Sequence, residues 1–439
     1  MNIKITTFAV ALIAGGLLAA APAAIVYKDG KTQNAHNIDG QTVSGISWQS
    51  TRGKVEPRLR LWDVDVINYT GRGMDEFNGL PRSLAAGQGQ RLLTNAGQVL
   101  KLEPVQGFNA ADWELNVRQS AMYFLAQGYL LSGNYSEAAK AFVEYFKAAE
   151  KSPATQGILP LNYRSAATGG AVQNAGGLNR YYLDALEAYT QCLFLDGKAE
   201  DARSKGLKGL QDLCDELAAK SGDNTYHEWT MRALRRAALY AESKKDWAGA
   251  RQAYEALIPV ALKRGDNKPN RAAKEAQLKV GFMQIKAGDA RGANARFIEA
   301  KTRWEAGHNH QRPQPPRADW LNADEAYMAA GSYLGLGLVK AHEAKTVADW
   351  SDALRNYSMS LSIFAADDEI RSMALLGAAR ACAELAELGK ANETTASNHA
   401  KLGEKYLAEL LNLMPKSRAA EDESIAGIQQ KITRYKKGE

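Results

Sequence analysis

The pattern of apolar and polar positions is most regular between Gln119 and Lys147. Two blocks of apolar residues recur at intervals of three and four, which places each block on one face of a helix. The blocks are Met122, Leu125, Ala126, Tyr129 and Leu130, then Ala138, Ala139, Phe142, Tyr145 and Phe146. Gly133 lies between them and can adopt the left-handed backbone that ends a helix. The pattern predicts two antiparallel helices that touch at the small Ala138.

Similar helix pairs are predicted at intervals down the rest of the chain. They cover residues 181–220, 226–263, 270–304, 322–364 and 367–413. An alanine stands at the predicted close contact of most pairs, and these residues are Ala138, Ala202, Ala250, Ala293 and Ala353. Because one helix pair cannot bury its apolar faces alone, stacked pairs form a continuous core. The expected fold is therefore mainly α: an irregular solenoid of about five to six helical hairpins.

The N-terminal part of the chain has a different pattern, in which apolar residues tend to alternate. Such alternation predicts short strands. The predicted strands are 25–27, 42–48, 59–62 and 64–69, with a last hairpin between Leu92 and Leu102. Residues 74–89 are predicted to be a loop, with a short helix at 81–86 as the alternative. Together these elements predict a small β meander or a partly closed barrel.

The first residues follow the layout of a secretory signal peptide. Lys4 precedes an apolar run from Phe8 to Ala20, and Ala21-Pro22-Ala23 forms a small-x-small cleavage site. A membrane anchor is the alternative, but the run is well short of the roughly 20 residues that a spanning helix needs. We expect cleavage near Ala24 or Ile25, no later membrane span, and a periplasmic or secreted mature protein.

These patterns divide the chain into four parts. They are a signal peptide (1–24), a small β module with linker (25–108), the solenoid (109–415), and a C-terminal helix or polar tail (416–439). A long connection at 152–180 interrupts the solenoid. Connections of this length inside compact arrays are uncommon, and many have a function. A structural lid and a ligand-contacting loop are both consistent with the sequence.

The helix pair at 119–147 resembles a tetratricopeptide repeat (TPR). The matching positions are Leu125, Tyr129, Gly133, Tyr135, Ala138 and Phe142. Ala126 stands where the family usually has glycine, the closing proline comes late at Pro153, and the spacing of the pairs exceeds the family's roughly 34 residues. The phrases YKDGKT, TVSGISWQS and WDVDVINYTG resemble a β module that precedes the repeats in some secreted bacterial repeat proteins. The resemblance implies a protein-interaction scaffold.

Composition and motifs favour no particular enzyme class. The net charge is a modest +6, and the sequence contains no nucleophile elbow, HExxH, CxxC, Walker or dinucleotide motif. Cys192, Cys214 and Cys382 fit no disulfide framework, so we expect buried free thiols. His308 and His310 stand one residue apart and could share a metal, but no third ligand is evident nearby. We therefore expect no cofactor and no enzymatic activity.

Charged residues concentrate in two places. Asp367, Asp368 and Glu369 begin a predicted helix, where the helix dipole favours acidic residues. Basic residues crowd the third and fourth helix pairs, between Arg232 and Lys286. In the TPR family, the first helix of each repeat lines a concave groove, so the resemblance places Arg232, Arg235, Leu239, Lys279, Phe282 and Ile285 in or beside that groove. An ordinary solvated helix face is the alternative.

The expected partner is a protein or peptide of the cell envelope that presents an extended or acidic segment. Nucleic acid is not expected, because the predicted location and the modest charge both disfavour it. Two other functions stay open: an enzyme, or a cell-wall or carbohydrate-binding protein, with its site between the β module and residues 152–180. Buried titratable groups around that connection would favour the enzyme. Exposed aromatic residues in a groove would favour the carbohydrate binder.

Overall fold

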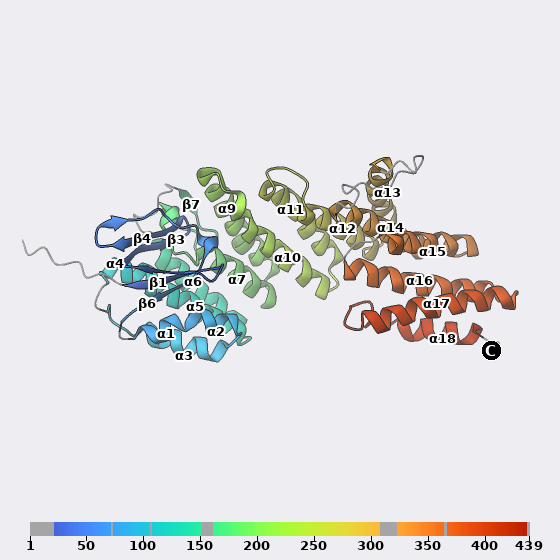
Figure 1. Ribbon diagram of the computed structural model, residues 1–439, viewed down its shortest axis with the longest axis horizontal. Coiled ribbons are helices and arrows are strands. Elements are labelled where there is room, and N and C mark those ends of the chain that lie inside the picture. The colour runs from blue at the N-terminus through green and yellow to red at the C-terminus, as the bar shows by residue number, and fades with distance from the viewer. Residues whose placement is uncertain are drawn as a thin grey trace, which may run out of the picture. The chain divides into compact units, whose positions relative to one another are not determined.

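The computed structural model describes residues 22–71, 73–105, 108–151, 161–307, 323–363 and 367–436. The chain divides into two compact units, Met1–Thr230 and Met231–Glu439, which we call unit 1 and unit 2. All the described strands belong to unit 1, and the described part of unit 2 contains helices only (Figure 1). The expected fold, a mainly α-helical TPR-like solenoid with a small β module before it, is confirmed.

The strands of the β module form two antiparallel three-stranded sheets. The sheets are β2 (Thr32–Ala35), β1 (Ala23–Tyr27) and β6 (Val64–Tyr69), then β3 (Asn37–Thr42), β4 (Gly45–Thr51) and β5 (Lys54–Val55). The sheet of β3, β4 and β5 is a meander of consecutive strands, as expected. The single strand predicted over 42–48 is wrong, because the chain turns before Gly45, whose φ of +124° favours glycine. The strand predicted over 59–62 is also wrong: Leu59 makes an isolated bridge to Ile46, and Leu61–Asp63 is a 3₁₀ turn, η1.

The segment after β6 is helical, so the loop predicted over 74–89 and the hairpin predicted over 92–102 are both wrong. Its helices are α1 (Met74–Asn78), α2 (Leu80–Ala85) and α3 (Gly89–Val99). The alternative of a short helix at 81–86 is confirmed by α2. Leu92, Ala96 and Val99 are buried along one side of α3, a helical spacing that the short apolar pairs obscure. Helix α3 packs on α5 (Gln119–Leu131), where Leu93 and Gly89 lie against Gly128.

The best-defined helix pair has the predicted form. It follows α4 (Ala110–Trp113) and a π-helical turn, η2 (Glu114–Arg118), and consists of α5 and α6 (Tyr135–Lys151). Gly133 takes the left-handed backbone with a φ of +77°, and Ala138 is fully buried. The next pair begins with α7 (Tyr182–Leu195) and returns through α8 (Ala199–Asp201), the π-helical η4 (Ala202–Leu207) and α9 (Lys208–Ser221). A 3₁₀ turn, η5 (Asn224–Tyr226), follows.

The described part of the 152–180 connection begins at residue 161 and is ordered against the β module. It forms the strands β7 (Asn162–Arg164) and β8 (Ala171–Gln173) and the 3₁₀ turn η3 (Ala175–Gly177). The backbone N–H of Val43 donates to Leu178 O at 2.8 Å, and Ser44 Oγ donates to Gly176 O at 2.8 Å. Residues 161–180 therefore tie the β3–β4 turn to the helices of unit 1.

Two asparagines complete this junction. Asn116 Oδ1 accepts from Gln41 N at 2.8 Å and Asn116 Nδ2 donates to Ile38 O at 3.3 Å, on either side of the irregular register at β3. Asn179 Nδ2 donates to Leu115 O, in the π-helical turn, at 2.5 Å. A bulge and a π turn each leave backbone groups without regular partners. The two side chains supply those partners where water cannot reach.

Unit 2 is a stack of helices, the first of which begins in unit 1. In order they are α10 (His227–Ser243), α11 (Trp247–Arg264), α12 (Arg271–Lys286), α13 (Ala290–Gly307), α14 (Ala323–Glu343), α15 (Val347–Ser362), α16 (Asp368–Leu388), α17 (Glu393–Leu413) and α18 (Ile425–Tyr435). From α11 to α18, successive helices pack on one another, and α14 also contacts both α12 and α16 (Figure 1). The helices α12, α14 and α16 therefore form one layer of the stack.

Glycines in this layer form sockets for aromatic rings of the other layer. A Cβ on Gly281 of α12 or on Gly335 of α14 would lie 2.5 or 2.4 Å from the Phe297 ring of α13. Tyr357 of α15 has the same relation to Gly337 and Gly377, at 2.6 and 2.5 Å. Real Cβ atoms do not approach a ring so closely, so each ring occupies space that only glycine leaves open.

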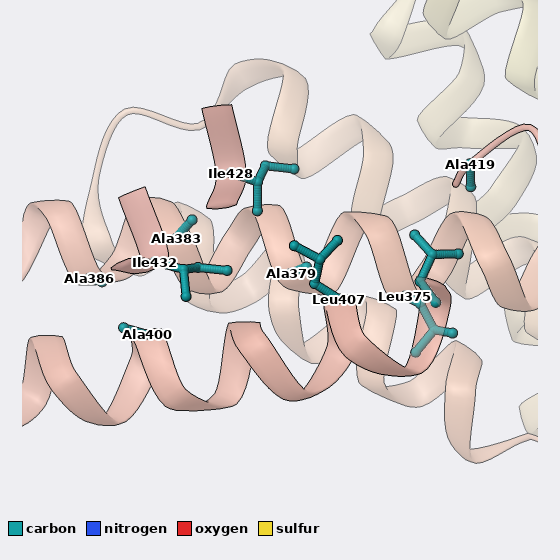
Figure 2. Close-up of a cluster of buried hydrophobic side chains, with 10 residues drawn as sticks. Leu375, Ala379, Ala383, Ala386, Ala400, Leu407, Ala419, Ile428 and Ile432 are labelled. Carbon is teal, nitrogen blue, oxygen red and sulfur yellow. The ribbon is translucent and has the colours of Figure 1, made fainter. Parts of the chain in front are cut away.

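The last helix covers the end of the stack. Figure 2 shows Ile428 and Ile432 of α18 directed at α16 and α17, where Ala379, Ala383 and Leu407 belong to the same buried cluster. These alanines let α18 approach closely, and the isoleucines exclude water from the last apolar face. The alternative of a C-terminal helix within 416–439 is thus confirmed for residues 425–435.

Candidate functional site

The six predicted partner-contacting residues lie on two helices of unit 2. Arg232, Arg235 and Leu239 are on α10, and Lys279, Phe282 and Ile285 are on α12. Arg235 Nη2 lies 3.9 Å from Glu275 Oε2 of α12, so the two helices are adjacent at this point. Leu239 is 46% exposed, whereas Ile285 is half-buried. The structure therefore places these residues on two helices of unit 2 that are adjacent at Arg235, and it exposes them unequally.

Phe282 is in the core, which corrects its assignment to a surface. It is only 6% exposed, and its ring centroid lies 5.5 Å from that of Phe297. A side chain in this position stabilises the stack of α12 on α13 and has little surface to offer a partner. The remaining candidates are Arg232, Arg235, Leu239, Lys279 and Ile285.

The acidic cluster and the basic tract, treated as separate features of the sequence, meet in the structure. Lys279 Nζ donates to Glu369 Oε1 at 2.5 Å, and Arg271 Nη2 donates to Asp367 Oδ2 at 3.3 Å. Asp367 also caps α16 by accepting from Ile370 N at 2.9 Å, so the expected capping role is confirmed. The beginning of α16 therefore neutralises part of the basic tract from across the layer of helices.

Other members of the basic tract are held by neighbours too. Lys274 Nζ lies 3.0 Å from Glu325 Oε1 of α14. The Arg271 guanidinium stacks over the Tyr327 ring at 3.3 Å, a cation–π contact that adds to its ion pair. These contacts show that much of the tract joins α12 to α14 and α16. The sequence could not predict the pairs, because their partners are distant along the chain.

The second predicted region, between the β module and residues 152–180, contains a buried polar network. Arg180 Nη1 donates to Gln41 Oε1 at 3.2 Å, and Gln41 Nε2 donates to Tyr69 OH at 2.7 Å. Asn179 Oδ1 accepts from Tyr145 OH at 3.2 Å. Desolvation raises the pKa of the Tyr69 and Tyr145 hydroxyls, which keeps both neutral. These groups bond to one another, which is the arrangement of a structural junction.

The cysteines are buried and unbridged, as expected. Burial raises the pKa of the Cys192 and Cys382 thiols to about 12, so neither is a reactive thiolate at neutral pH. His308 and His310 lie outside the described residues, and within those residues no group of three or more metal-ligating side chains gathers. No described helix is both long enough and apolar enough to cross a bilayer.

Comparisons with known proteins give resemblances of architecture only. No protein-family model matches the chain, and no curated protein sequence matches it. One similar structure is the C-terminal part of a TPR repeat-containing protein from Cytophaga hutchinsonii, with 11% identity, coverage of 79% of this chain and 98% of that one, and a TM-score of 0.40. Another is the P58(IPK) TPR domain, with 14% identity, coverage of 83% and 98%, and a TM-score of 0.20.

A third similar structure is NprR in complex with its cognate peptide NprX, with 13% identity, coverage of 82% of this chain and 95% of that one, and a TM-score of 0.29. At these scores the similarity is too general to transfer a site or a partner. The class of the protein rests on its own helices: each unit contains consecutive helical hairpins of the TPR-like kind, α5–α6 and α7–α9 in unit 1 and α12–α13 to α16–α17 in unit 2.

Proposed function

We propose that this protein is an extracytoplasmic protein–protein interaction scaffold that binds a partner segment rich in acidic and apolar side chains. The observation that carries the proposal is a stripe of residues on α10. Arg232, Arg235 and Leu239 follow one another at intervals of three and four, so they share one side of the helix. We call these three residues the α10 stripe. Its leucine is among the most exposed large apolar residues of the described chain.

The charge of Arg235 can be recruited by a partner at little cost. The ion pair between Arg235 and Glu275 is long, at 3.9 Å, and both side chains are more than a third exposed. Pairs of this kind contribute roughly 0–1 kcal/mol. A partner carboxylate can bind the guanidinium in bidentate fashion and replace this contact. Lys279, held at 2.5 Å by Glu369, is the less available cation.

The test is fluorescence anisotropy with two labelled peptides of equal length, one of alternating glutamate and leucine, the other with lysine in place of glutamate. We expect the acidic peptide to bind and the basic one not to bind. Arg232→Ala combined with Arg235→Ala should weaken binding, and Leu239→Ser should weaken it separately. The loss from the arginine pair should shrink as salt rises, because exposed charges are screened over about 8 Å at physiological ionic strength.

The control removes equal charge elsewhere. Arg52 and Arg203 are exposed arginines of unit 1, and Arg52→Ala with Arg203→Ala has the same effect on net charge. If this control weakens binding as much as the double change on α10, net charge explains the effect and the stripe is not the site. Equal binding of the two peptides would also contradict the proposal.

The extracytoplasmic location is supported by the signal-peptide pattern at the N-terminus of the sequence. Residues 1–21 of that pattern lie outside the described residues. Mass spectrometry of the protein exported by a bacterial host should find a mature start near Ala24 or Ile25. Strand β1 begins at Ala23, so a start at Ala24 would remove only the first residue of that strand. A mature protein that retains Met1 would contradict the proposed location without affecting the peptide-binding test.

A further inference from the structure

A cleft in unit 1 has no part in the proposed interaction. It has a volume of about 600 Å³ and lies where the end of β6 meets α1, α2 and the beginning of α3. Seven of its lining residues are polar or charged: Asn68, Asp75, Asn78, Arg82, Ser83, Gln88 and Arg91. Known small-molecule sites span a volume range of roughly 300–1,000 Å³. The cleft is therefore large enough for a small ligand.

The charged residues of the cleft are not paired with one another. Arg82 and Arg91 make no ion pair with any described residue, and Arg91 has only a long hydrogen bond, 3.4 Å, from its Nη1 to Gln88 Oε1. Asp75 lines the same cleft and likewise has no ion pair within the described chain. Opposite charges that share a cleft without neutralising each other are available to a ligand that carries both signs.

Two further features of the cleft favour a ligand with hydrogen-bonding groups. Ser83 is only 3% exposed, yet its hydroxyl has no hydrogen-bond partner among the described residues. The hydroxyl oxygen itself still reaches solvent, so it is open to a hydrogen bond with a ligand in the cleft. In addition, no side chain caps the beginning of α3: Gly89 N donates to Gly87 O at 3.1 Å, and the N–H groups of Gln90 and Arg91 are left for an acceptor beside the Arg91 side chain.

We propose that this cleft binds a small zwitterion, a molecule with one carboxylate and one ammonium group. Arg82, Arg91 and the first turn of α3 bind the carboxylate, and Asp75 binds the ammonium group. The Ser83 hydroxyl donates to the ligand or accepts from it. A dianion without an ammonium group would be repelled by Asp75, which distinguishes this site from a general anion site. Free amino acids and short peptides share the required chemistry.

The experiment is isothermal titration calorimetry of the full chain at low salt with alanine, alanyl-alanine, succinate and inorganic phosphate. We expect alanine or alanyl-alanine to bind, and the stronger of the two identifies the source of the zwitterion. Arg82→Gln with Arg91→Gln should lower that affinity at least tenfold. Arg52→Gln with Arg203→Gln, which removes the same charge elsewhere in unit 1, should not change it.

A change at Asp75 is the sharpest test, because the two kinds of ligand should respond in opposite directions. Asp75→Asn should weaken binding of the zwitterion and strengthen binding of succinate. Arg82, Arg91 and Asp75 are exposed, so these variants should fold, and circular dichroism checks that they do. The proposal is overturned if neither zwitterion binds, if succinate or phosphate binds as tightly to the unchanged protein, or if Asp75→Asn shifts both kinds of ligand alike.

Discussion

The two units of this protein fill their interiors with different chemistry. The buried polar residues of unit 1 include Gln41, Asn116, Asn179 and Arg180, and they bond to backbone groups and to one another. In the described part of unit 2, the buried polar residues are Gln284 and three serines. There the helices meet through glycine sockets for Phe297 and Tyr357 instead.

The difference follows from the backbone. A helix satisfies its own N–H and C=O groups except at its ends, so a stack of helices needs only shape complementarity between its layers. Unit 1 joins strands to helices through a bulge, a π turn and an irregular connection, all of which leave backbone groups without partners. Side-chain amides must then supply the missing hydrogen bonds. We expect unit 1 to be sensitive to polar substitutions and unit 2 to changes of volume.

The largest expected effect is the loss of an aromatic ring from its socket. Phe297→Ala should destabilise unit 2 by roughly 3–5 kcal/mol, because it leaves a cavity between α12, α13 and α14. Hydrogen exchange with mass spectrometry can assign the loss of protection to a unit. A loss of hydrogen-exchange protection mainly in unit 1 would contradict the expectation that changes of volume affect unit 2.

The polar counterpart is Asn179 in unit 1. Asn179→Ala removes partners from Leu115 O and Tyr145 OH, and a buried group left unpaired costs roughly 1–3 kcal/mol. The same exchange measurement should show lost protection in the strands and helices of unit 1. Asn356→Ala is the control, because its amide only donates to the exposed backbone of Asp352 and should be nearly neutral. Similar effects of both changes would mean that burial of the amide is not the cause.

The effect of a Gly→Ala substitution on stability should change sign between a crowded position and an open one. Gly335→Ala should cost about 1–3 kcal/mol through its clash with Phe297, more than the gain of about 1 kcal/mol in helix propensity. Gly427 lies in α18, where an added Cβ would meet no atom within 4 Å, so Gly427→Ala should stabilise. Thermal unfolding measures both. A rise in the midpoint for Gly335→Ala would show that the socket has room to relax.

The sequence predicted the helical hairpins well, because each buries one side at a spacing that residues such as Leu125, Tyr129 and Phe142 reveal. The sequence-based prediction failed for features that depend on contacts with residues far away along the chain. Helix α3 was missed because its apolar pairs, Leu92-Leu93 and Val99-Leu100, fit either period. The roles of Asn116 and Asn179 could not be predicted, since an asparagine in a helix or a loop has no pattern of its own.

The candidate site was predicted less completely than the fold. Family position placed the candidates on α10 and α12, which are adjacent at Arg235 and Glu275, but it could not show that Phe282 is buried in the core or that Glu369 binds Lys279. The cleft beside α2 and α3 was missed altogether. Residues 74–89 were predicted as a loop and 92–102 as a hairpin. Without the helices α2 and α3, the prediction had no reason to place Arg82 and Arg91 beside the same cleft.

The smallest expected effect uses the buried thiols as a separate probe of each unit. Because burial raises the pKa of Cys192 and Cys382 to about 12, a thiol reagent at neutral pH should label them only after local opening. Ile432 of α18 and Cys382 of α16 both lie against Gly403 of α17. Ile432→Val removes one methyl group from the packing of α18 beside Cys382. It should cost roughly 0.5–1.5 kcal/mol and speed labelling of Cys382 about two- to tenfold. Mass spectrometry can follow Cys192 in the same sample, and its rate should not change. If both thiols respond together, the two units open as one and the contrast between their interiors has no consequence for stability.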